Sequence, residues 1–178
     1  MMHKFFVIFC FFTLLSCSNS QPRRPINPKP SATSIQTNVK TSKQLIEREE
    51  TEILDFISKD SLINYEISTN GFWYAYETKI ESQVPTPKTG DTVAFQYDIR
   101  SLNDSIIYSK FVLGVKKYKV DQEDFISGIQ QGIKLMKVGE TVIFVIPSYN
   151  AFGILGDGNK IGMHTTIKSK VTLLNIIN

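Results

Sequence analysis

An apolar run of eleven residues, Phe5–Leu15, lies near the start of the chain, directly after Lys4. A helix that crosses a bilayer needs roughly 20 apolar residues, so this run is too short to span one. A charged residue followed by a short apolar core is typical of a secretory signal. The sequence therefore predicts that residues 1–16 are a signal peptide and that the fold is built from the residues that follow.

Cys17 ends the tetrad Leu14-Leu15-Ser16-Cys17, which resembles the lipobox of bacterial lipoproteins. The resemblance implies that Cys17 is acylated and becomes the new N-terminus. The alternative is an ordinary signal peptide with an incidental cysteine. Because Cys10 lies within the signal, the mature chain would have no free thiol for a disulfide, a metal site or a nucleophile. We expect an exported, membrane-anchored protein that faces the periplasm.

Two further segments precede the main domain. Residues 17–41 contain four closely spaced prolines and few apolar groups, which predicts a lipidated Cys17 followed by a disordered linker. From Ser42, a plausible N-cap, apolar residues recur at helical spacing, which predicts a helix over 43–58 within an extension of residues 42–69. The pattern leaves open whether this helix packs on the main domain or pairs with a partner.

Strand signals dominate the rest of the chain. Aromatic and β-branched runs bounded by turn residues predict strands over 65–67, 72–76, 92–100, 105–112, 141–147 and 165–177. Gln122–Met136 has apolar side chains at helical spacing and predicts one short helix. These elements predict an α+β domain over 70–178, in which an antiparallel sheet packs against that helix.

Most residue types used in catalysis are scarce. His3 leaves with the signal, so His164 would be the remaining histidine, and a structural role is favoured for it. The glycine-rich segment 153–162 lacks the Gly-Lys-Ser/Thr ending of a phosphate-binding loop. A calcium loop that begins at Asp157 would have Ile161 at its fifth and Lys168 at its twelfth position, where oxygen ligands belong. The basic residues are scattered, which does not indicate a nucleic-acid partner. We expect no cofactor and no metal.

Two motifs resemble the FK506-binding (FKBP) type of peptidyl-prolyl isomerase. Residues 125–140 (FISGIQQGIKLMKVGE) resemble its helix segment, and residues 147–153 (PSYNAFG) resemble the strand-to-loop motif that follows. The resemblance spans about residues 70–178. Together with the lipobox and spacer, it is nearest to the lipid-anchored isomerases associated with bacterial gliding motility. It implies a half-wrapped antiparallel sheet around a short helix, with an apolar cleft between them.

The chemistry that the resemblance implies is rotation about X–Pro bonds. Amide resonance gives this rotation a barrier of about 18–20 kcal/mol. A cleft that strips water from the amide favours the twisted state and needs no metal, acid or base. Proline-containing proteins of the cell envelope are the expected clients, and the membrane is contacted through the lipid. Two alternatives are a non-catalytic chaperone or scaffold with the same fold and a purely structural lipoprotein.

The resemblance also implies roles for individual residues. It assigns catalysis to Tyr97 and Phe152, and places Tyr108, a possible hydroxyl donor, where the family has an aspartate. The substrate-binding residues that it implies are Phe125, Ile126, Ile129 and Ile161. Ile129 replaces a tryptophan, Phe152 a tyrosine, and Ser169 an aromatic residue. These departures predict weaker or more restricted isomerase activity.

Overall fold

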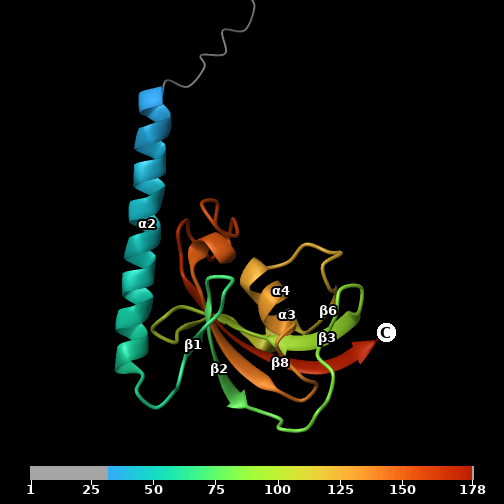
Figure 1. Ribbon diagram of the computed structural model, residues 1–178. Coiled ribbons are helices and arrows are strands. Elements are labelled where there is room, and N and C mark those ends of the chain that lie inside the picture. Colours follow the sequence, from blue (N-terminus) through green and yellow to red (C-terminus); the bar gives the residue numbers. More distant parts are fainter. Residues whose placement is uncertain (1–31, 178) are drawn as a thin grey trace, which may run out of the picture. The chain divides into compact units, whose positions relative to one another are not determined.

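The computed structural model describes residues 32–177 (Figure 1). The predicted signal peptide and the predicted lipidation site at Cys17 lie outside the described residues. Helix α2, Ala32–Lys59, begins ten residues before Ser42, so the predicted linker over 32–41 and the N-cap at Ser42 were wrong. No proline or glycine lies between Ala32 and Thr41. Helix propagation costs little once a packed turn exists, so the helix extends back to this point.

The sheet is antiparallel, with the strand order β1-β2-β7-β8-β3-β6, and β4 pairs with both β8 and β5. The strands are β1 Glu66–Ile67, β2 Trp73–Thr78, β3 Thr92–Tyr97, β4 Ile99–Arg100, β5 Ile106–Tyr108, β6 Val115–Lys119, β7 Thr141–Ile146 and β8 Ile167–Ile177. Helix α3 is Lys110–Leu113, helix α4 is Ser127–Ile133, and the 3-10 turn η2 is Ser148–Asn150. The predicted α+β plan of an antiparallel sheet with a short helix is confirmed.

Two strand predictions need correction. The predicted strand over 105–112 ends at Tyr108, because Ser109 caps the short helix α3 and its Oγ accepts the N–H of Val112 at 3.4 Å. Strand β6 was missed altogether. Its sequence, VKKYK, contains three lysines and only one buried side chain, Tyr118, so it has almost no strand signal of its own. Pairing with β3 supplies the missing stabilisation.

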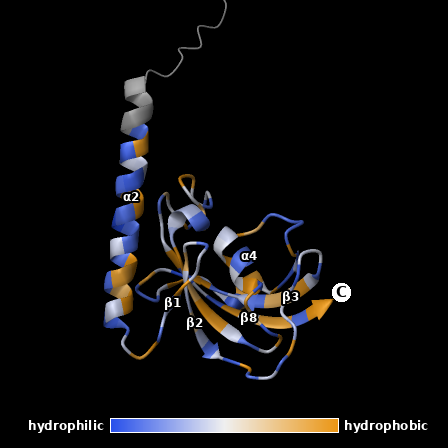
Figure 2. Cartoon of the chain, viewed as in Figure 1, coloured by the Kyte–Doolittle hydropathy of each residue, from blue (hydrophilic) through white to orange (hydrophobic). Residues whose placement is uncertain are grey.

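Helix α4 packs very close to β7. A Cβ at Gly132 would lie 2.4 Å from a ring carbon of Phe144, and one at Gly128 would lie 2.6 Å from Ile146. Glycine at these two positions therefore lets the helix backbone approach the sheet. The fully buried side chains of Phe95, Ile129 and Phe144 fill the space around this contact. Figure 2 shows apolar residues along β3 and β8, the strands that carry much of this core.

Helix α2 packs on the sheet domain through its C-terminal half. Ile53 is fully buried against Trp73 and Val145. One turn earlier, the carboxylate of Glu49 is also buried and accepts two hydrogen bonds from Ser148, at 2.7 Å from the backbone N–H and 2.6 Å from the hydroxyl. Of the two arrangements that the sequence left open, the structure shows packing on the domain. Within residues 32–177, no helix combines the length and apolarity needed to cross a bilayer.

Glu49→Ala should destabilise the domain, because it leaves the buried N–H and hydroxyl of Ser148 without an acceptor. We expect the free energy of unfolding in urea to fall by about 2–4 kcal/mol. Glu47→Ala is the matched control, since the exposed Glu47 side chain forms a long ion pair with Lys43 at 4.0 Å and bears no buried hydrogen bond within residues 32–177. Equal losses for the two variants would contradict the structural role given to Glu49.

Candidate active site

The seven side chains predicted for the site converge on one apolar cluster, although they come from several elements. They are Tyr97 at the end of β3, Tyr108 at the end of β5, Phe125 and Ile126 before α4, Ile129 within α4, Phe152 after η2, and Ile161 before β8. We call these seven residues the aromatic site. They are brought together by the packing of α4 and two loops on the same face of the sheet. Their catalytic and binding roles stay predictions.

Phe125 is the hub of the aromatic site. Its ring meets Tyr97 edge-to-face with centroids 5.4 Å apart, and it meets Phe95 at 5.6 Å in the same manner. Such pairs favour this geometry because the positive ring edge faces the negative ring face. Phe125 is half-buried, whereas Ile126 and Ile129 are buried. Ile129 therefore belongs to the core beneath the site, whereas Phe125 is partly exposed to solvent.

The Tyr97 hydroxyl has no hydrogen-bond partner within the described part of the chain, and its oxygen is accessible although only 8% of the whole residue is exposed. Burial raises the pKa of Tyr97, so the hydroxyl keeps its proton at neutral pH. A neutral hydroxyl that lacks a partner beside an apolar surface can donate to a ligand carbonyl. Tyr97 is therefore the available donor in the aromatic site.

The Tyr108 hydroxyl is already used, because it donates to the carboxylate of Asp157. Asp157 in turn accepts the N–H groups of Ile161 and Asn159 at 2.8 and 2.9 Å. The hydrogen bond from Tyr108 lowers the pKa of Asp157 and raises the pKa of Tyr108. Tyr108 therefore ties β5 to the loop that carries Ile161. Sequence reasoning missed Asp157 as a partner, although Asp-Gly-Asn is a typical turn signal for such a loop.

The loop that carries Phe152 is held from two sides. The N–H groups of Ala151 and Gly153 donate to the Ser148 carbonyl at 2.9 and 2.8 Å, and Glu49 binds the other polar groups of Ser148. The backbone N–H of His164 donates to the Gly153 carbonyl at 3.0 Å, which joins the two arms of the loop. Phe152 itself is half-buried and presents an apolar ring without a hydroxyl.

Ser169, at the position where the family has an aromatic residue, is fully buried. Its hydroxyl donates to the Asp98 carbonyl at 2.6 Å and so joins β8 to the break between β3 and β4. At this position a small serine that forms a hydrogen bond therefore takes the place of an aromatic ring. The substitution removes apolar surface from the region and adds backbone support.

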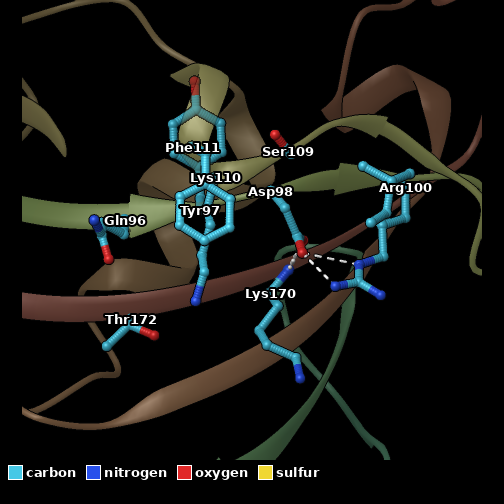
Figure 3. A pocket seen from close by; sticks show the side chains of 10 residues that line it. Gln96, Tyr97, Asp98, Arg100, Ser109, Lys110, Phe111, Lys170 and Thr172 are labelled. Atoms are coloured by element: carbon cyan, nitrogen blue, oxygen red, sulfur yellow. Dashed lines mark hydrogen bonds and ion pairs between the residues drawn. The ribbon is translucent and has the colours of Figure 1, made fainter. Parts of the chain in front are cut away.

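A cavity of about 220 Å³, lined by both polar and apolar side chains, adjoins the aromatic site, because Tyr97 is among the residues that line it (Figure 3). Gln96 and Thr172, which pair in register and alternate with core residues, form part of its lining. The Asp98 carboxylate is bound by Arg100 at 2.6 and 2.8 Å, so it is not free to act as a base. Within residues 32–177, no cluster of three His, Cys, Asp or Glu side chains could hold a metal ion.

Comparison with known proteins identifies the class. A family model described as FKBP-type peptidyl-prolyl cis-trans isomerase matches residues 84–174, half of the chain. The crystal structure of a peptidyl-prolyl cis-trans isomerase from Pseudomonas syringae pv. tomato str. DC3000 is similar in fold, with a TM-score of 0.59 at 21% identity. That match covers 77% of this chain and 96% of the other. The chain belongs to the FKBP-type peptidyl-prolyl cis-trans isomerase family. The matched segment contains the whole aromatic site and leaves out α2.

Tyr97→Phe should lower kcat/KM for X–Pro isomerisation, because it removes the one unengaged hydroxyl of the aromatic site while keeping the ring. A single hydrogen bond corresponds to a loss of about threefold to tenfold. Tyr74→Phe is the control, since it removes an exposed hydroxyl bonded to Glu66. The assignment of Tyr97 as donor would be wrong if both variants kept the parent kcat/KM.

The activity should be flat between pH 7 and 9 and fall only above about pH 10, where Tyr97 begins to ionise and can no longer donate. Tyr97→Phe should lack this alkaline fall. The free energy of unfolding should also fall at alkaline pH. The folded state raises tyrosine pKa values, that of Tyr76 to about 12, so this contribution is full below pH 10 and is lost as the pH rises. Trp73 fluorescence separates unfolding from inactivation. A change in activity between pH 7 and 9 while the chain stays folded would contradict the prediction.

Proposed function

We propose that this isomerase is anchored to a membrane through a lipid on Cys17 and assists the folding of envelope proteins, with gliding-motility components among its clients. The observation behind this proposal is the tetrad Leu14-Leu15-Ser16-Cys17, which follows a short apolar run and precedes an isomerase domain in one chain. Lipidation would keep the enzyme beside proline-containing chains that cross or assemble at that membrane. Stable anchoring needs about two acyl chains, since one myristoyl chain binds only marginally.

The proposed catalysis uses shape, desolvation and one donor. The half-exposed rings of Phe125 and Phe152 would cover the proline and remove water from its amide. The amide loses charge separation as it twists, so a dry apolar surface favours the twisted state over the planar one. Tyr97 would donate to a carbonyl of the bound peptide. An acceleration of about 10⁴ requires roughly 5–6 kcal/mol of preferential binding to the twisted state.

Metabolic labelling with a fatty-acid analogue tests the anchor. The native chain should carry label and sediment with membranes. Cys17→Ser should lose the label and leave the membrane fraction, because the acyl acceptor is gone. Cys10→Ser is the matched control and should still be labelled, since Cys10 lies inside the predicted signal. Label that persists in Cys17→Ser would refute the lipoprotein assignment.

A complementation test separates catalysis from a scaffold role. A strain without the gene would receive either the double variant Tyr97→Ala/Phe152→Ala or a variant with the Ile53 contact removed by Ile53→Asp. If catalysis is the cellular function, the double variant fails to restore envelope assembly or gliding even when its fold is intact. Full rescue by the double variant, together with failure of Ile53→Asp, would favour the non-catalytic scaffold.

A further inference from the structure

Two lysines border the aromatic site from different elements. The Lys116 ammonium on β6 lies 5.5 Å from the ring centroid of Phe125, and the Lys160 ammonium lies 5.0 Å from that of Tyr108. Both rings are half-exposed members of the site. Lys160 Nζ also donates to the Ile107 carbonyl at 3.4 Å. These contacts hold two positive charges beside the surface where the proline would bind.

Neither charge is neutralised by a neighbour. Within residues 32–177, no carboxylate oxygen lies within 4.0 Å of Nζ of Lys116 or Lys160, whereas Lys134, Lys168 and Lys170 each form an ion pair. The acidic side chains close to these lysines in the sequence include Asp157, Glu123 and Asp124, and the first two accept hydrogen bonds from uncharged donors. Asp157 accepts from the Tyr108 hydroxyl and from backbone N–H groups, and Glu123 accepts the N–H of Lys119 at 3.2 Å. Within residues 32–177 the two ammonium groups at the border of the site are therefore free of direct ion pairs.

The position of each lysine favours contact with a ligand. A lysine stem can lie along an aromatic face while its ammonium group stays hydrated, and the attraction between ammonium and ring keeps the charge in place. The ammonium can still bind a carboxylate that arrives with a substrate. Lys116 shares the inner face of β6 with buried Tyr118, whereas Lys117 points to the opposite face and is exposed. Strand β6 thus places Lys116 at the site and Lys117 away from it.

We propose that Lys116 and Lys160 determine substrate specificity by selecting X–Pro segments with a glutamate or aspartate next to the proline. The proposal rests on the isomerase activity at the aromatic site and adds a substrate class to it. A carboxylate beside the proline would reach one of the two ammonium groups while the proline ring lies on Phe125. Partly exposed ion pairs of this kind correspond to a preference of about fivefold.

Matched peptides test the preference. The substrates are Ala-Glu-Pro-Phe against Ala-Gln-Pro-Phe and Ala-Ala-Pro-Glu against Ala-Ala-Pro-Gln, so that only the charge differs within each pair. The enzyme is the mature chain with Cys17→Ser, and exchange NMR measures kcat/KM at low and high salt. We expect at least one pair to show a preference for glutamate of about fivefold, which shrinks as salt screens the charges.

The variants Lys116→Gln and Lys160→Gln, and their combination, locate the effect. The double variant should lose the preference while its kcat/KM for the glutamine peptides stays within twofold. Lys117→Gln removes the same charge from the opposite face of β6 and should keep the preference. The proposal is overturned if neither pair shows a preference for glutamate, or if the preference survives in the double variant.

Absence of isomerase activity would be recognised separately from absence of charge selection. If the chain accelerates none of the four peptides, their dissociation constants from amide chemical shifts decide the selectivity instead. Tighter binding of the glutamate peptides that depends on Lys116 and Lys160 would support the charge selection without catalysis. Equal dissociation constants within both pairs would overturn it.

Discussion

The close approach of α4 to β7 is the contact on which the rest of the domain depends. Gly128 and Gly132 leave no room for a side chain against Ile146 and Phe144, so the helix lies directly on the sheet. This approach brings Ile129 into the core and places Phe125, just before the helix, against Tyr97. A larger residue at either glycine would move the helix outward and separate the rings of the site. The geometry of the aromatic site is thus a consequence of helix-to-sheet packing.

Two carboxylates, those of Glu49 and Asp157, hold the two loops of the site by hydrogen bonds. Glu49 holds Ser148 and so connects the accessory helix to the loop that carries Phe152. Asp157 holds Tyr108 and the backbone of the loop that carries Ile161. Both loops therefore have polar attachments to elements outside themselves. An aspartate expected within the site is replaced by Tyr108, and the carboxylate that binds this tyrosine comes from the opposite loop.

The sequence predicted the α+β plan from hydrophobic periodicity, which reflects local constraints. The helical glycines and the buried strand over 141–147 are of this kind. The site residues came from the family resemblance, and the structure places them in one cluster. Other features depend on tertiary pairing and had no local signal. Strand β6 is stabilised by its partner β3, and the partner of Tyr108 is 49 residues away. Lys116 and Lys160 were likewise invisible, since only the folded chain places them beside aromatic rings.

Exchange NMR of a mixed X–Pro peptide pool with the isotope-labelled mature chain tests the central claim most directly, because it reports both rate and location. We predict that micromolar enzyme accelerates cis–trans exchange far above the uncatalysed timescale of tens of seconds or longer. The amide shifts should move mainly around Phe125, Phe152 and Ile161. Unchanged exchange rates, or shifts confined to the outer strand positions Gln96 and Thr172, would contradict catalysis at the aromatic site.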